Sequence, residues 1–152
     1  MYLHQHAVGG VAVAVAASHA LPDLDSPTSI AIVIALCIVS HFVLDLFDEA
    51  LIVGTEFEKI ATMEILGLGA LAGVVINFVP IELHGLALLG AIAGNVPDIW
   101  DKKLYLSMID RKRWPMFNHW PCHWPSYPRI KMSGLATFLA TVALLATIPL
   151  VA

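Results

Sequence analysis

Five apolar runs constrain the fold of this chain more than any other feature. The sequence is 59% hydrophobic and 13% charged, whereas about a quarter of the residues in a typical soluble domain are charged. A run of about 20 apolar residues is long enough to cross a bilayer as a helix. The pattern therefore predicts an all-α integral membrane bundle of about five helices, folded as a single domain over residues 1–152. The runs cover residues 7–21, 30–47, 60–79, 83–96 and 132–152.

The basic residues favour one orientation in the membrane. Seven of the eight lie in or beside the segment 98–131, and the eighth, Lys59, lies in the link 48–59. If all five runs cross the bilayer, these two segments lie on the same side, and the positive-inside tendency makes that side cytoplasmic. The N-terminus is then cytoplasmic too. The net charge of -4 argues against nucleic acid as a partner.

This topology sorts the ionisable residues by depth. A helix rises about 1.5 Å per residue, so residues at opposite ends of one run cannot share a site. The outer ends carry a sparse set, namely His19, Asp23, Asp25, Glu82 and His84. The cytoplasmic ends carry a denser one, which comprises His4, His6, His41, Asp45, Glu64, Asp98, Asp101, His119 and His123.

His41 and Asp45 are the most informative pair in this inner group. They are four residues apart, so both side chains leave one face of a helix, one turn apart. Ionisable groups inside an apolar run are costly unless something compensates them. Imidazole and carboxylate are ligands of zinc and similar divalent ions, so the pair predicts metal binding. The alternative is a His–Asp hydrogen bond that packs two helices together.

The other predicted ligands are His6, Asp98, His119 and His123. His6 is preferred to His4 because it lies closer to the apolar run. Asp98 follows Pro97, which is expected to end the fourth helix and open a long loop over residues 98–131. His119 and His123 are also four apart, but Pro121 lies between them, and the alternative is an interfacial belt with the neighbouring Trp residues.

Two carboxylates are candidates for catalysis rather than for binding. Asp101 follows Asp98 by three residues, and Glu64 lies one turn into the third run. Either carboxylate can serve as a general base, but Glu64 can equally pair with Lys59 or with a neighbouring helix. The number of metal ions is left open, as is a second site at Asp23 and Asp25.

The chain resembles a known family on three motifs: the early His6, the Pro-Asp turns at 21–25 and 96–101, and Ser-His-x-x-x-Asp at 40–45. These look like the bacterial and archaeal membrane-bound metal-dependent hydrolases, which are similar to zinc-dependent phospholipase C and the P1-type nucleases. The resemblance implies a helical bundle with up to three zinc ions that activate water against a phosphodiester. It matches His41 and Asp45 to paired ligands, Asp98 to the Pro-Asp ligand, and His119 with His123 to a remaining pair.

Together these features predict a zinc-dependent hydrolase in a prokaryotic inner or plasma membrane. Its expected substrate is a phospholipid or another membrane phosphodiester at the cytoplasmic face, where residues 111–113 (Arg-Lys-Arg) suit an anionic headgroup. One alternative is a metal-ion transporter, which should carry polar residues in mid-membrane, where these runs have almost none. The other is a non-catalytic membrane scaffold that uses the same residues for interhelical hydrogen bonds.

Overall fold

The computed structural model describes residues 3–45, 47–49, 57–107, 130–132 and 134–152. Almost all of the described residues are helical, and the predicted all-α class is confirmed. The elements are α1 (Leu3–Ser18), α2 (Pro27–Leu44), α3 (Phe57–Phe78), the short 3-10 helix η1 (Ile81–Leu83), α4 (His84–Ser107) and α5 (Gly134–Val151).

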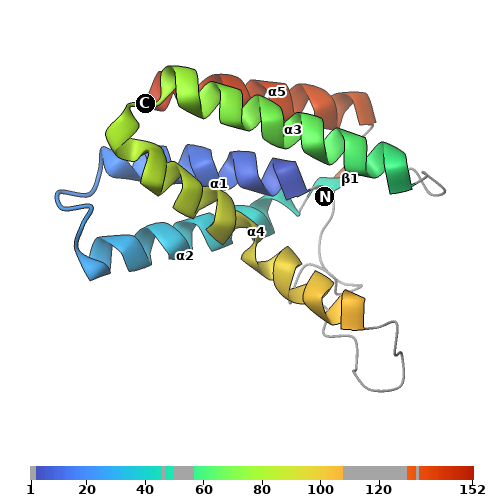
Figure 1. Cartoon of the computed structure of the whole chain (residues 1–152), viewed down its shortest axis with the longest axis horizontal. Helices are drawn as coiled ribbons and strands as arrows, with labels where there is room; N and C mark the ends of the chain where they lie inside the picture. The colour runs from blue at the N-terminus through green and yellow to red at the C-terminus, as the bar shows by residue number, and fades with distance from the viewer. Residues whose placement is uncertain (1–2, 46, 50–56, 108–129, 133) are drawn as a thin grey trace.

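Successive helices run in opposite directions, and α1 lies among the other four (Figure 1). Helix α1 contacts each of α2, α3, α4 and α5. One end of the bundle therefore collects the starts of α1, α3 and α5 with the ends of α2 and α4. The N-terminus lies at this end, which we call the site end (Figure 1).

The small side chains of α1 explain its central position. Its sequence is mostly Ala, Gly and Val, and Val8, Val11 and Val15 are at most 1% exposed. Small residues let neighbouring helix backbones approach closely. The closest approach is to α4, where a Cβ placed on Gly10 would lie 2.0 Å from the carbonyl oxygen of Gly90.

Helix α4 is longer than the sequence predicts. Pro97 is expected to end it, but α4 continues through Pro97 to Ser107. A proline inside a helix removes one backbone hydrogen bond and can bend the helix without ending it. The predicted loop over 98–131 therefore begins as helix, and this part of α4 extends past the rest of the bundle (Figure 1). Residues 108–129 lie outside the described residues.

Two short strands, absent from the predicted elements, lie beside the site end. Strand β1 (Phe47–Glu49) pairs in parallel with β2 (Ile130–Met132), and Phe47 lies opposite Ile130. The pairing brings the residues that precede α5 next to those that follow α2. It also holds the chain close to Asp45, which ends α2.

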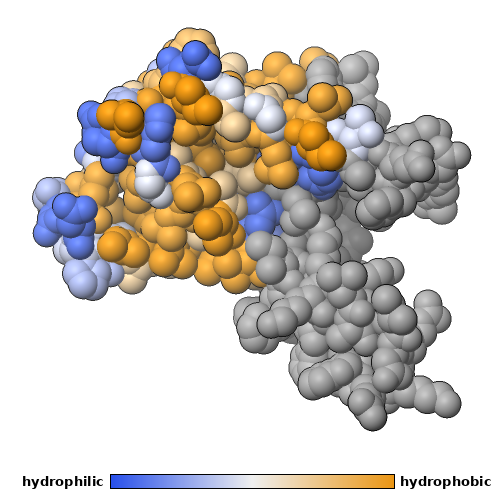
Figure 2. All heavy atoms as spheres, viewed as in Figure 1, coloured by the Kyte–Doolittle hydropathy of each residue, from blue (hydrophilic) through white to orange (hydrophobic). Residues whose placement is uncertain are grey.

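The outer surface of the bundle is strongly apolar. Apolar side chains cover most of the described face in Figure 2, and polar ones gather toward the left end. Among the described residues, α2 is the one helix both long and apolar enough to cross a membrane. The apolar helical segments Thr62–Phe78, Ile81–Pro97 and Leu139–Val151 are shorter. The five predicted spans are thus five helices, of which one qualifies by length and hydropathy.

Candidate metal centre

His6, His41 and Asp45 converge at the site end of the bundle. The Nε2 atom of His6 lies 3.3 Å from Oδ1 of Asp45, and Nε2 of His41 lies 3.1 Å from Oδ2. One ligand atom from each of the three residues lies within 4.8 Å of the others. Both imidazoles are fully buried, and the Asp45 side chain is 11% exposed. The structure therefore holds three ionisable side chains around one small volume.

Two antiparallel helices place these side chains. His6 lies near the start of α1, and His41 lies in the last turn of α2. Asp45 is the C-cap of α2, and its backbone N–H donates to the His41 carbonyl at 2.9 Å. The imidazole rings of His6 and His41 stack with centroids 3.8 Å apart. Cap and stacking together fix where the three ligand atoms lie.

A backbone contact determines how His41 presents its ring nitrogens. Nδ1 of His41 lies 2.8 Å from the carbonyl oxygen of Gly94 in a buried contact. Because a carbonyl can only accept, Nδ1 carries the proton and donates. In the neutral imidazole, Nε2 then bears a lone pair, and it faces a carboxylate oxygen of Asp45. Two acceptors this close need a cation between them, which is either a proton on Nε2 or a metal ion.

The donor set and the spacing fit zinc. Zinc takes imidazole nitrogen and carboxylate oxygen at about 2.0–2.2 Å in tetrahedral sites, so two ligand atoms on one ion lie about 3.3 Å apart. The two nitrogen–oxygen distances to Asp45, 3.3 and 3.1 Å, match that spacing. Two His and one carboxylate are also a ligand set of catalytic zinc sites, which keep a further position open.

Of the six predicted ligands, the structure brings together these three. Within the part of the chain that is described, they form the only group of three or more His, Cys, Asp or Glu residues within reach of one ion. Asp98 and the predicted base Asp101 lie in the C-terminal part of α4, where the structure describes the backbone alone. His119 and His123 lie outside the described residues.

Glu64 contacts His4 rather than joining the three ligands. Its Oε2 accepts from the backbone N–H of His4 at 2.9 Å and lies 3.2 Å from His4 Nδ1. The His4 ring packs on Gly67, where an added Cβ would lie 2.4 Å from His4 Cγ. Glu64 thus ties α3 to the start of α1, as the alternative of pairing with a neighbouring helix expects. A carboxylate here also suits the positive end of the α1 dipole.

We expect Glu64→Ala to lower stability and leave metal binding intact. The substitution removes a helix-end hydrogen bond, and such losses cost about 0.5–2 kcal/mol. Thermal unfolding of the purified protein measures the loss, and elemental analysis measures the metal. Glu82→Ala is the matched control, because Glu82 is exposed in η1. A Glu64→Ala protein of normal stability that lacks the hydrolytic activity predicted from the sequence would instead support Glu64 as the general base.

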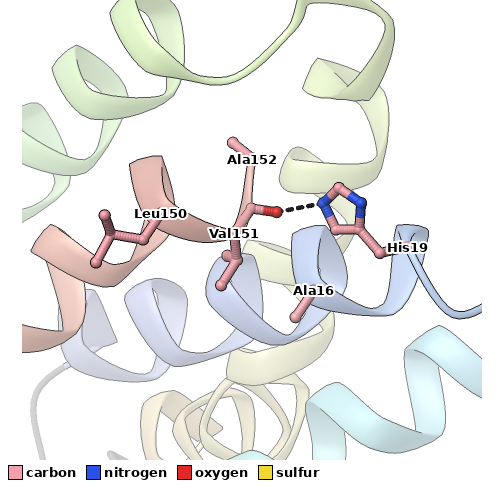
Figure 3. A pocket seen from close by; sticks show the side chains of 5 residues that line it. All are labelled: Ala16, His19, Leu150, Val151 and Ala152. Atoms are coloured by element: carbon pink, nitrogen blue, oxygen red, sulfur yellow. Dashed lines mark hydrogen bonds between the residues drawn. The ribbon is translucent and has the colours of Figure 1, made fainter.

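The outer residues do not gather in the same way. At the far end of the bundle, His19 contacts the carbonyl oxygen of Val151 through Nε2 (Figure 3). His84 contacts the carbonyl oxygen of Val79 at 3.0 Å, and Asp23 accepts from the N–H of Asp25 at 3.1 Å. These are contacts with the backbone, and the described residues form no second group of metal ligands there.

Sequence reasoning missed the role of Gly94. The glycines of the fourth run were visible, and Gly90 and Gly94 have the small-xxx-small spacing of close helix contacts. The acceptor for His41, however, is a backbone carbonyl, which no side-chain pattern reveals.

Comparison of the chain with known proteins identifies no relative. No family model matches the chain, and neither does any curated protein or solved structure.

Proposed function

We propose that this protein is an integral membrane hydrolase that uses a divalent metal ion, zinc by its donor set, to cleave a phosphodiester such as a phospholipid. The observation that carries the proposal is the convergence of His6, His41 and Asp45 at one end of a bundle with an apolar exterior. The resemblance of the sequence motifs to membrane-bound metal-dependent hydrolases points the same way.

The exposed apolar side chains support a membrane location. Leu36, Val39 and Val43 of α2 are 43–55% exposed, and Ile65 of α3 is 70% exposed. Soluble monomers rarely expose large continuous apolar patches. Only 22% of the 18 residues of α2 are buried inside the protein, whereas the core helix of a soluble domain is mostly buried. Lipid is a solvent that suits such a surface.

The basic residues support a cytoplasmic site end. Lys59 lies in the first turn of α3, Lys102 and Lys103 lie near the end of α4, and Lys131 lies in β2. Each of these positions belongs to the end of the bundle that holds the metal ligands. Under the positive-inside tendency, that end faces the cytoplasm.

Hydrolysis is the chemistry that this ligand set suits best. When bound, a zinc ion polarises a phosphoryl oxygen and makes a water molecule more acidic. His6, His41 and Asp45 would hold the ion. Asp98 and Asp101 follow Gly94 by four and seven residues in α4. We assign Asp98 to the ligand set and Asp101 to the general base.

An apolar groove beside the site supports a lipid substrate. It has a volume of about 510 Å³ and lies between α2 and α5, with α1 residues including Gly9 among its lining. Ser40 and Leu44, which precede His41 and Asp45, line it near the site end. Its two hydroxyls, on Ser40 and Thr147, donate to carbonyls of their own helices. The walls therefore suit an acyl chain whose headgroup reaches the metal ligands.

The full chain in detergent tests this function. We expect about one zinc ion per chain or more, and hydrolysis of a fluorogenic phosphodiester lipid, with both lost in His41→Ala. His84→Ala is the matched control, because His84 lies at the far end and contacts a backbone carbonyl. Zinc without hydrolysis but with uptake into vesicles would replace the proposal with a transporter. If the protein binds no zinc and His41→Ala leaves its fold unchanged, the scaffold alternative remains.

A further inference from the structure

The carbonyl of Gly94 lies where it can orient the ring of His41, one of the three proposed metal ligands. It accepts from Nδ1 of His41 at 2.8 Å, and this contact is buried. The opposite ring nitrogen of His41 is the one that faces Asp45. A metal-ligating histidine almost always donates its other N–H to a carbonyl, carboxylate or water, which fixes the ring and its tautomer.

A close crossing of α1 and α4 brings this carbonyl within reach. A Cβ on Gly90 would lie 2.5 Å from the carbonyl oxygen of Gly10, and a Cβ on Gly94 would lie 2.5 Å from that of His6. Side chains at these positions would force the two helices apart. Cys37 of α2 also reaches this crossing, since its Sγ donates to the Gly10 carbonyl at 3.3 Å. The glycines therefore set the distance between α4 and α1, the helix that carries His6.

We propose that Gly94 is a positioning residue for the metal: its carbonyl holds His41 with Nδ1 protonated, so that Nε2 is the ligating atom. Gly10 and Gly90 keep α4 close enough for this contact. The inference rests on the proposed metal site and adds to it the identity of the ligating nitrogen. A carbonyl has two lone pairs, so Gly94 can serve His41 without leaving the helix hydrogen-bond ladder.

Zinc affinity, measured on the full chain in detergent by competition with a chelator, tests the role of Gly94. Gly94→Ala keeps the carbonyl but places a Cβ 2.5 Å from the carbonyl oxygen of His6, so we expect it to move α4 and take that carbonyl away from His41. Loss of an outer partner typically costs 10–100-fold in metal affinity, and we expect a loss of that size. Gly85→Ala is the matched control, because Gly85 lies in the same helix with open space around its Cβ position. We expect Gly85→Ala to bind zinc as the unchanged protein does. Equal affinities in the two variants would overturn the inference and leave the metal site standing.

A second measurement is made on the unchanged protein, and a variant serves only to assign the signals. In the zinc-loaded unchanged protein, ¹⁵N NMR of labelled histidines should show the His41 ring with a protonated Nδ1 and a coordinated Nε2. His41→Gln, which lacks that ring, assigns its signals. Coordination through Nδ1 would overturn the inference alone. An unchanged protein that binds no zinc would overturn both the inference and the proposed function.

Discussion

Replacing Asp45 by Asn should abolish the proposed zinc binding and leave the bundle folded. Asp45 lies within 3.3 Å of both His6 and His41. The amide has nearly the same shape but no charge, and it places an NH₂ group where a ligand oxygen stood. We expect zinc affinity to fall by more than about 100-fold, because changes to outer partners alone cost 10–100-fold. Elemental analysis and chelator competition on the purified protein measure the change.

The control for this experiment is Asp25→Asn, because Asp25 is exposed in the link between α1 and α2. A different result would identify Asp45 as the partner of a protonated histidine. In that case neither protein would hold zinc, and Asp45→Asn would be destabilised by about 3–5 kcal/mol, the usual effect of breaking a buried ion pair. Metal content and unfolding temperature, measured together, separate the two roles.

That the start of the first apolar run meets His41 and Asp45 could be predicted, because the depth of these residues depends on chain direction and helix rise alone. His6 stands near the start of one apolar run, and His41 stands near the end of the next. If two successive helices are antiparallel and similar in length, these ends lie at the same depth. The separation of four residues between His41 and Asp45 then places both on one face of the helix. No knowledge of lateral packing is needed for this step.

Packing between neighbouring helices determines which of His4 and His6 meets Asp45, and this could not be predicted from the sequence. His4 and His6 are two residues apart, so they leave α1 about 200° apart, and only their neighbours determine which one meets Asp45. Helix α3 provides Glu64 for His4, whereas α2 provides Asp45 for His6. The end of α4 is a similar case. Pro97 disfavours a helix locally, but it removes only one hydrogen bond, and α4 continues past it.

A lysine in the middle of α2 should prevent stable insertion into the membrane. Leu36 lies near the middle of α2 and is 43% exposed on the outer surface. If that surface faces lipid, Leu36→Lys places an ammonium group in the hydrocarbon, which costs about 2.5–3.5 kcal/mol at a helix centre. In water, a surface substitution of this kind changes stability by less than about 0.5 kcal/mol. The fraction of the chain that resists carbonate extraction from membranes measures the effect.

Ile81→Lys is the matched control for Leu36→Lys. Ile81 is 80% exposed, but it lies in η1 at the end of the bundle. A lysine there can extend its ammonium group to the interface, so insertion should be retained. The membrane location is wrong if Leu36→Lys and Ile81→Lys behave alike and both remain folded in water without detergent. The membrane location is supported if only Leu36→Lys releases the chain from the membrane. Both positions are apolar and exposed, so their different depth in the bilayer would then explain the different results.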